Sequence, residues 1–414
     1  MNETQLVLDG ESLITPEAVA AGTASTRPAF GGDQLEIAKA ELGLILHSTR
    51  QKFQSGKDPV DTMRWTVQKL HELRSKAGGG VWRELLPIAQ AHPVAAFFHQ
   101  DPFTRWSFEK PRGYSGDASL LDFIYQHETI AENVARATPM GRELYAFSKY
   151  YPSCIAVRER RDLLTTYVDE IADMHGPETE ILAIAAGHLR EANGSVALQK
   201  GRIKRWVALD QDPLSVASIK YDFEGTSVEA TDGSVRSVLM SGDKLGKFDF
   251  IYAAGLYDYL PHKVAVKLTQ KCLQMLKPNG VFLFANFSPE MTDDGFMETF
   301  MNWTLLQRSD ADMWSIVNAS VDRNSVDAQV YFGANRNIVY ATLRKRREIS
   351  GIAVVTKMVD PTARFEAIME PTDRWLVWDN ATELPAEDAE FELFGLTHDE
   401  AIVHCRRLNG LPPG

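Results

Sequence analysis

The sequence predicts an α/β protein built around a doubly wound, mainly parallel sheet that occupies residues 178–346. In this segment helical patterns alternate with continuous apolar runs, which are typical of strands buried on both sheet faces, at residues 181–186, 206–209, 248–253 and 281–285. Two further strands, near residues 328–332 and 338–343, are separated by the turn-forming segment 333–337. This spacing predicts an antiparallel hairpin at one edge of the sheet.

The segment before the sheet is expected to be helical, with a leader ahead of it. Residues 1–33 are rich in Ala, Thr, Ser and Gly and show no sustained period, which is typical of a flexible leader. Residues 34–177 carry helical patterns at 35–45 and 63–70, and the glycines at 78–80 are expected to end the second helix. We expect this region to form a lid that shapes a substrate pocket.

An aromatic segment stands out within this helical region. Eight aromatic side chains lie between residues 97 and 125, and such a density must be buried against other parts of the chain. Inside it, the segment 111–117 contains two glycines that allow a backbone turn to approach another surface closely. Asp117 is placed to cap the helix that follows. The aromatic segment 97–125 is the best candidate for the lid itself.

The last residues, 347–414, exceed what the sheet needs. They contain short apolar runs and a helical pattern from Thr397 to Leu408. We expect a small C-terminal unit that covers an edge of the sheet or makes a subunit contact, which would give a homodimer.

Composition and charge narrow the class of protein. Lys and Arg number 44 against 56 Asp and Glu, and the net charge of −12 argues against a nucleic-acid or anionic-lipid partner. The three cysteines are far apart, and no His-Glu-x-x-His or Cys/His cluster occurs, so neither a disulfide framework nor a metal site is expected. No apolar run has the length of a membrane span, and no signal-peptide pattern is present. These features favour a cytoplasmic protein that stays where it is made.

Polar residues and glycines follow the predicted strands at positions suited to a nucleoside cofactor. The first strand runs into Gly187 and then into helix-forming residues, so the backbone can approach a ligand where the N-terminus of the expected helix points. The second strand ends at Asp210, which can accept hydrogen bonds from both ribose hydroxyls. One glycine stands where a dinucleotide site needs three, and no phosphate-binding loop occurs, so a cofactor without phosphates fits better. Asp232, before Gly233, can accept from an adenine amino group, and the fourth strand exits through Gly255.

These features resemble the class I, Rossmann-like S-adenosylmethionine-dependent methyltransferases over about residues 178–345. A narrower likeness, to a bacterial subfamily that includes 3-hydroxy fatty acid methyl ester biosynthesis proteins, is carried by residues 111–117, 187–191, 255–260 and 286–289, with Glu298, Trp303 and Arg308. The run Ala185-Ala186-Gly187-His188 departs from the subfamily's usual cysteine-glycine-proline turn. The resemblance implies a doubly wound, seven-stranded methyltransferase sandwich that binds S-adenosylmethionine and releases S-adenosylhomocysteine.

The resemblance and the strand-end positions together define an expected site. The expected cofactor-binding residues are Tyr114, Asp117, Gly187, Arg190, Asp210, Gln211, Asp232, Gly233 and Gly255. The expected catalytic residues are Tyr114, Tyr257 and Arg308. A carboxylate acceptor is already ionised at neutral pH and needs no general base, so Arg308 or a tyrosine would only orient it. An amine or phenol acceptor would need a base, for which Asp258, His262 and His188 are candidates.

Several functions remain open at this level. Methylation of a small molecule at oxygen is slightly favoured over methylation at nitrogen or sulfur in a natural-product pathway. A non-catalytic protein that uses the fold for cofactor binding or regulation is the alternative suggested by the atypical Ala185-Ala186 turn. A nicotinamide-dependent oxidoreductase is disfavoured by the missing glycines.

Overall fold

The computed structural model describes residues 32–346, 364–369, 375–380, 384–388, 391–393 and 396–410. The predicted leader therefore lies outside the described residues, apart from its last two positions. These belong to the first described helix, α2, which already begins at Gly32.

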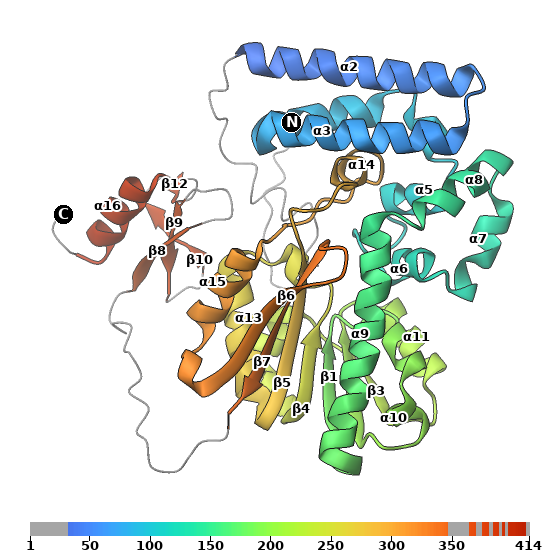
Figure 1. Cartoon of the computed structure of the whole chain (residues 1–414). Helices are drawn as coiled ribbons and strands as arrows, with labels where there is room; N and C mark the ends of the chain where they lie inside the picture. Colours follow the sequence, from blue (N-terminus) through green and yellow to red (C-terminus); the bar gives the residue numbers. More distant parts are fainter. Residues whose placement is uncertain are drawn as a thin grey trace.

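A seven-stranded sheet forms the centre of the molecule, with the strand order β3-β2-β1-β4-β5-β7-β6 (Figure 1). Its strands are β1 (Glu180–Ile184), β2 (Arg205–Asp210), β3 (Val228–Asp232), β4 (Phe248–Ala253), β5 (Leu276–Phe287), β6 (Val326–Phe332) and β7 (Ile338–Lys345). The first five strands pair in parallel, whereas β7 pairs antiparallel with both β5 and β6. The predicted edge hairpin is confirmed, and β7 is inserted between β5 and β6.

Helices cover both faces of the sheet, which explains the continuous apolar runs. Along β1, Ile181 and Ala183 belong to one buried core, whereas Leu182 and Ile184 belong to the other. The first core is closed by α9 (Pro152–His175) and α11 (Pro213–Asp222). The second is closed by α12 (Val235–Ser241), α13 (His262–Met275) and α15 (Asp310–Ser320).

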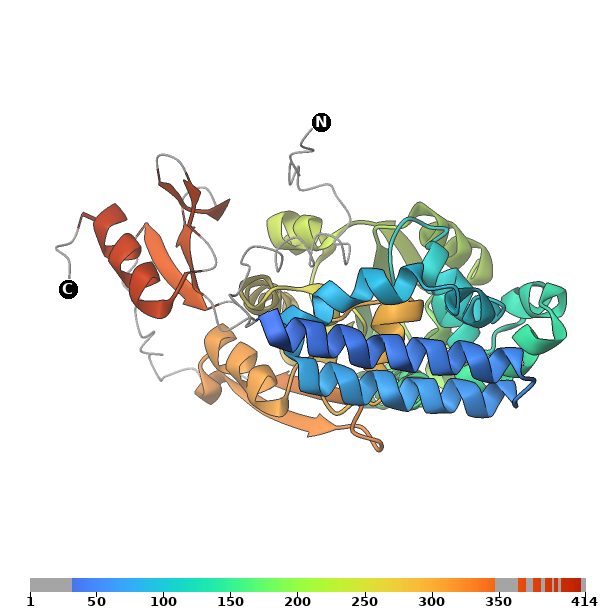
Figure 2. The same cartoon turned by 90° about the horizontal axis from the view of Figure 1, so that it is seen from above.

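Two long helices, α2 (Gly32–Gln54) and α3 (Pro59–Ala91), lie side by side above the sheet (Figures 1 and 2). The expected break at the glycines 78–80 is present inside α3, because Gly78 has non-helical φ and ψ angles of 69° and 158° and joins two helical segments at a kink. A second helical segment follows directly, and Trp82, Leu85 and Ala89 form its buried face.

The short helix α14 (Asp294–Phe300), between β5 and β6, joins these two helices to the sheet. All of its residues are buried, and a Cβ on Gly295 would lie 2.6 Å from the backbone of Leu70 in α3. Arg74 of α3 donates to Asp294 at 2.6 Å and to Glu298 at 2.9 Å. Glu298 also accepts from the indole of Trp82, so it has a structural role here.

Five shorter helices connect α3 to α9: α4 (Ala95–Phe98), α5 (Pro102–Glu109), α6 (Ala118–Tyr125), α7 (Ala131–Arg136) and α8 (Pro139–Ser148). They contain the aromatic segment, and its predicted burial is confirmed for Phe98, Phe103 and Phe123. The ring of Phe98 packs edge-on against Phe296 of α14 at 5.1 Å. Asp117 caps α6 as predicted, because its carboxylate accepts from the amide of Leu120 at 2.9 Å.

The described part of the C-terminal segment forms a small unit of its own. Its elements are β8 (Phe365–Met369), β9 (Trp375–Asp379), β10 (Leu384–Pro385), β11 (Glu387–Asp388), β12 (Phe391–Glu392) and α16 (His398–Leu408). The predicted last helix is confirmed, with Thr397 as its cap. Val377 and Ala401 contribute to a separate buried cluster, and Lys263 of α13 lies 4.1 Å from the ring centre of Trp378. Among the described residues no helix has the length and apolar character that crossing a bilayer requires.

Candidate functional site

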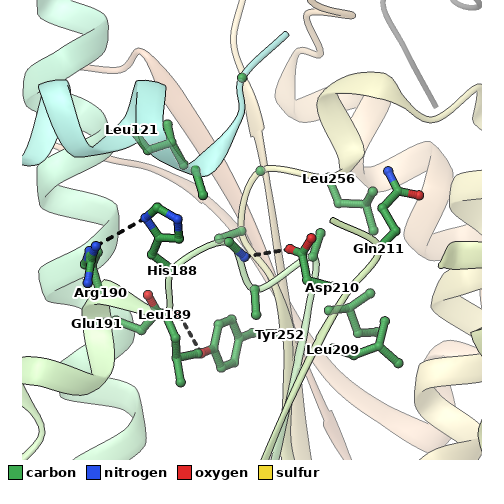
Figure 3. Close-up of a pocket in the computed structure, with 18 of the residues that line it drawn as sticks. Leu121, His188, Leu189, Arg190, Glu191, Leu209, Asp210, Gln211, Tyr252 and Leu256 are labelled. Atoms are coloured by element: carbon green, nitrogen blue, oxygen red, sulfur yellow. Dashed lines mark hydrogen bonds between the residues drawn. The ribbon is translucent and has the colours of Figure 1, made fainter. Parts of the chain in front are cut away.

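A cavity opens at the carboxyl ends of β1, β2 and β4 (Figure 3). It encloses about 1160 Å³, part of which is open to solvent. Its floor is the turn after β1 together with the exits of β2 and β4, and its walls come from α9 and from the loop around Tyr114. In open α/β sheets ligands bind at this edge, where the strand order reverses.

The turn after β1 is fastened to the end of β2. Gly187 donates its backbone N–H to Oδ2 of Asp210 at 2.7 Å, and Oδ1 of Asp210 accepts from the amide of Asp212 at 2.8 Å. Burial raises the pKa of Asp210, while these amide hydrogen bonds favour its ionised form. Gly187, Ala185 and Leu189 all have positive φ angles. The turn therefore carries backbone strain, of the kind that concentrates at functional sites.

The chain beyond this turn differs from the expectation. A helix was expected to point its N-terminus at the ligand, but the structure has a 3₁₀ segment, Arg190–Gly194, and a four-residue helix, α10 (Val196–Gln199). Leu189 enters this segment in a left-handed conformation, and the side chains of Arg190 and Glu191 are tied to other elements. The cavity floor is thus made of a turn and fixed side chains, with no long helix dipole behind it.

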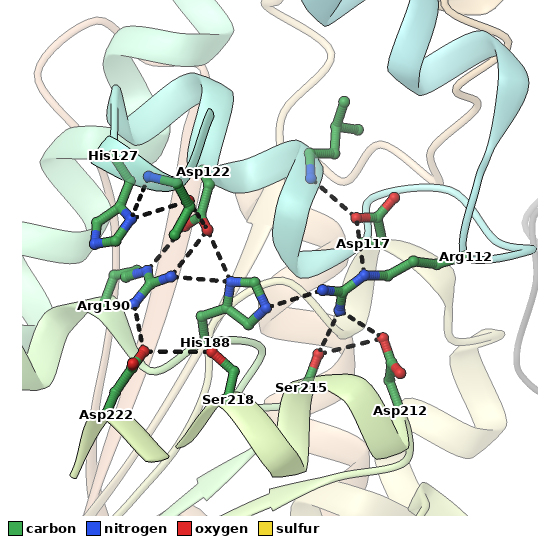
Figure 4. Close-up of polar contacts among 12 residues, drawn as sticks. Arg112, Asp117, Asp122, His127, His188, Arg190, Asp212, Ser215, Ser218 and Asp222 are labelled. Atoms are coloured by element: carbon green, nitrogen blue, oxygen red, sulfur yellow. Dashed lines mark hydrogen bonds and ion pairs between the residues drawn. The ribbon is translucent and has the colours of Figure 1, made fainter. Parts of the chain in front are cut away.

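The loop after α5 closes over the cavity through Asp212 (Figure 4). Arg112 donates to Oδ2 of Asp212 at 2.8 Å, and the hydroxyl of Tyr114 donates to the same oxygen at 2.9 Å. Burial would raise the pKa of Asp212, but hydrogen bonds from Leu214, Tyr114 and Arg112 outweigh it and hold the pKa below its usual value. Burial also raises the pKa of Tyr114, so the hydroxyl remains a donor.

His188 links this loop to α6 (Figure 4). Its Nε2 lies 3.1 Å from a guanidinium nitrogen of Arg112, which can only donate, so Nε2 accepts. Its Nδ1 lies 2.9 Å from Oδ2 of Asp122 and donates to it. Arg190 binds both oxygens of Asp122 and reaches Asp222 at 2.9 Å. Burial would raise the pKa of Asp122, but Arg190 and His188 hold it well below its usual value.

The structure brings most of the expected residues together. Those that line the cavity are Tyr114, Gly187, Arg190, Asp210, Gln211, Gly233 and Gly255. Two expected cofactor residues lie off it. Asp117 is occupied in capping α6 and in accepting from the indole of Trp106 at 3.0 Å. Asp232 is exposed at the end of β3, although the next residue, Gly233, does line the cavity.

The placement of Tyr257 and Arg308 corrects the expected catalytic set. Tyr257 is fully buried, its ring stacks on Phe284 with centroids 4.2 Å apart, and its hydroxyl bonds Thr269 of α13 at 2.8 Å. Arg308 is 5% exposed and donates to the backbone carbonyls of Tyr257 and Leu260 and to Asn286. Neither side chain lines the cavity, because each is used to hold the exit of β4 in place.

Of the three candidate bases, only His188 lines the cavity. Asp258 is buried away from the cavity and accepts from the amide of Phe287 at 2.6 Å, and burial raises its pKa to about 7. His262 begins α13 and does not line the cavity either. His188 does line it, but both of its ring nitrogens are engaged. Within the described residues no group of three or more His, Cys, Asp or Glu side chains is placed to hold a metal ion.

The residues expected from the sequence do not include several side chains that line the cavity together with Asp210. These are Arg160 of α9, Tyr125 of α6, and Glu191, Tyr252 and Tyr259. One signal was available for Arg160. It lies on the same helical stripe as Val157, Leu164 and Val168, all of which are buried, and a charged residue at such a position is unusual.

The strand order and the antiparallel β7 confirm the doubly wound, seven-stranded α/β sandwich that the resemblance to class I methyltransferases implies, and the cavity lies at the ends of β1 and β2. No family model and no curated protein matches the chain. Among solved structures, a possible exported protein from Bordetella parapertussis is 15% identical over 75% of this chain and 97% of its own, with a TM-score of 0.45. The CurJ carbon methyltransferase is 11% identical over 80% and 94%, with a TM-score of 0.42. N-methyltransferase NodS from Bradyrhizobium japonicum, in complex with S-adenosyl-l-homocysteine, is 17% identical over 55% and 100%, with a TM-score of 0.32.

Proposed function

We propose that the protein transfers a methyl group from S-adenosylmethionine to a small-molecule acceptor. The observation that carries this proposal is the position of Asp210, at the carboxyl end of β2 and beside the strained Gly187 turn. Each carboxylate oxygen accepts one backbone N–H and keeps a lone pair for a ribose hydroxyl. The apolar side chains of Leu209 and Val235 line the neighbouring wall, where an adenine ring would pack.

The same residues argue against a dinucleotide. The turn between Ala185 and Leu189 contains a single glycine, so it lacks the glycine-rich cradle that a pyrophosphate requires. A bound S-adenosylmethionine would supply the reactive methyl on a positively charged sulfur. The contribution of this chain is to position that group and to exclude water, with the loop of Arg112 and Tyr114 as the cover.

Among acceptors, a carboxylate oxygen is favoured over nitrogen or sulfur. Both ring nitrogens of His188 are occupied by Arg112 and Asp122, which leaves this histidine poorly placed to take a proton. A carboxylate has a pKa of roughly 4 and needs no base at neutral pH. Methylation of a protonated amine or a thiol would need a group that takes the proton, and of the three candidate bases predicted from the sequence only His188 lines the cavity.

Calorimetry with S-adenosylmethionine, S-adenosylhomocysteine and NAD tests the proposal. We expect the first two to bind the wild-type protein and NAD not to bind. Asp210→Asn should weaken binding of S-adenosylhomocysteine at least tenfold, because an amide cannot accept from both hydroxyls as a carboxylate does. Asp232→Asn is the matched control and should bind as the wild type does. Absence of binding to the wild type would refute the proposal.

A further inference from the structure

Arg160 is a buried cation on the wall of the cavity. Arg160 is only 3% exposed, and it is one of the residues that line the cavity. One guanidinium nitrogen donates to the backbone carbonyl of Ala254 at 2.6 Å. The other lies close to Gly255, where a Cβ would be 3.5 Å away. The guanidinium therefore sits at the exit of β4, on the opposite side of the cavity from Asp210.

The other arginines at this site are each paired with a carboxylate. Arg112 pairs with Asp212, Arg161 with Asp162, and Arg190 with both Asp122 and Asp222. Arg160 has no carboxylate within ion-pair distance among the described residues. An unpaired charge is costly to bury, so a charge kept in such a place indicates a partner that arrives from outside.

The charge of Arg160 acts on two buried carboxylates, those of Glu191 and Asp258, and each already accepts a hydrogen bond from another group. Glu191 accepts from the hydroxyl of Tyr252, and Asp258 accepts from the amide of Phe287. Tyr259 also lines the cavity, and its hydroxyl oxygen accepts from the indole of Trp303 at 2.8 Å. Its proton therefore remains available for donation. Arg160 and Tyr259 both line the cavity, and each keeps a donor that no carboxylate of the described residues accepts.

We propose that Arg160 binds the carboxylate of a ligand, with the hydroxyl of Tyr259 as a second donor. The planar guanidinium fork matches a carboxylate in geometry and charge. The inference rests on the proposed function, which offers two sources of this group. One is the amino-acid end of the cofactor, and the other is a carboxylate acceptor held for methylation. Arg160 would then do what was expected of Arg308.

The test compares Arg160→Met with Arg136→Met, which removes an exposed arginine of α7 that is paired with Glu132 and does not line the cavity. Binding is measured by calorimetry for S-adenosylhomocysteine and for 5′-deoxy-5′-methylthioadenosine, which lacks the amino-acid part. Hexanoate and hexan-1-ol are then titrated into protein saturated with S-adenosylhomocysteine. Arg160→Met should bind at least one carboxylate probe tenfold or more weakly, and methylthioadenosine as the wild type does. Arg136→Met should bind all probes within about twofold of the wild type.

The possible outcomes distinguish a cofactor carboxylate from an acceptor carboxylate, and they distinguish a failure of this inference from a failure of the proposed function. A loss confined to S-adenosylhomocysteine assigns Arg160 to the cofactor, and a loss confined to hexanoate assigns it to the acceptor. Unchanged binding of both carboxylates, or an equal loss for methylthioadenosine, overturns the inference. A wild-type protein that binds no S-adenosylhomocysteine refutes the proposed function instead. The melting temperature of ligand-free Arg160→Met should not fall, since an unpaired buried charge has been removed. If that variant does not fold, Arg160→Lys, which keeps the charge but loses the fork, should show the same selective loss.

Discussion

The hydroxyl of Tyr114 donates a hydrogen bond to Oδ2 of Asp212 at 2.9 Å, and Asp212 stands two residues after the end of β2. Arg112 binds the same oxygen at 2.8 Å. A loop from the N-terminal helices is thereby fastened to the strand end that carries Asp210. Since the cavity lies directly beneath this loop, a ligand that fills it is enclosed by contacts from two distant parts of the chain.

Arg112→Gln should loosen this cover. Losing the charged hydrogen bonds costs the closed loop about 1.5–3 kcal/mol, so we expect S-adenosylhomocysteine to dissociate about 10- to 150-fold faster. Stopped-flow fluorescence measures this rate, and hydrogen exchange should rise across residues 110–117. Arg105→Gln removes only an exposed pair with Glu109 and should leave both unchanged. Equal dissociation rates for the two variants would show that the loop is not a cover.

Gly187→Ala should impair cofactor binding through both strain and contact. The position has a φ of 57°, and a Cβ would meet that of Ala118 at 3.4 Å. A left-handed alanine costs about 1–2 kcal/mol. Gly201→Ala carries the same backbone strain at φ 62° with no neighbour within 4 Å, and it lies outside the cavity. We expect both variants to melt earlier, and only Gly187→Ala to bind S-adenosylhomocysteine more weakly. A similar binding loss in both would trace the effect to stability alone.

Tyr257→Phe should lower stability without affecting the site. The hydroxyl bonds Thr269 at 2.8 Å in a fully buried setting, and the loss of such a bond costs about 1 kcal/mol. Urea unfolding should show this decrease, while the affinity for S-adenosylhomocysteine stays within error of the wild type. A tenfold weaker affinity of this variant for S-adenosylhomocysteine would show that Tyr257 does contribute to the binding site.

Asp258→Asn should remove a pH dependence of stability. Burial raises the pKa of Asp258 from 3.8 to about 7, so the folded protein holds a proton that the unfolded chain has released. Stability from this residue is therefore full below about pH 4 and falls as the pH rises toward 7. The variant stays neutral, and its free energy of unfolding relative to the wild type should rise over this range by at most about 4 kcal/mol. Chemical unfolding from pH 4 to 8 measures the difference, and Glu170→Gln, at an exposed position of α9, should show none.

The sheet could be predicted from the sequence because its strands are buried on both faces. In β1 every residue from Ile181 to Ile184 must be apolar, whichever face it serves, and this leaves an unbroken run to recognise. Gly187 and Asp210 were found for a related reason. Each follows a strand directly or ends it, so the strand alone places the residue at the ligand-binding edge.

Side-chain direction could not be predicted in the same way. A 3₁₀ turn spans Tyr257–Tyr259. It directs the ring of Tyr257 against Phe284 and places Tyr259 on the cavity lining. The sequence does not indicate which of these two tyrosines, two positions apart, lies at the site. Arg308 was misplaced because two of its three buried partners are backbone carbonyls, which no residue pattern reveals. Asp232 and Gly233 are adjacent, yet only the glycine lines the cavity.

The ion pairs between Arg74 and α14 bear on where this chain can be divided. Asp294 and Glu298 are both buried, and the cation that neutralises them comes from α3. A fragment beginning at residue 178 would keep these carboxylates and lose their counter-charge, while uncovering Phe296 and Phe300. We therefore expect the sheet and the N-terminal helices to unfold together, and a fragment cut at their boundary in the sequence to be unstable.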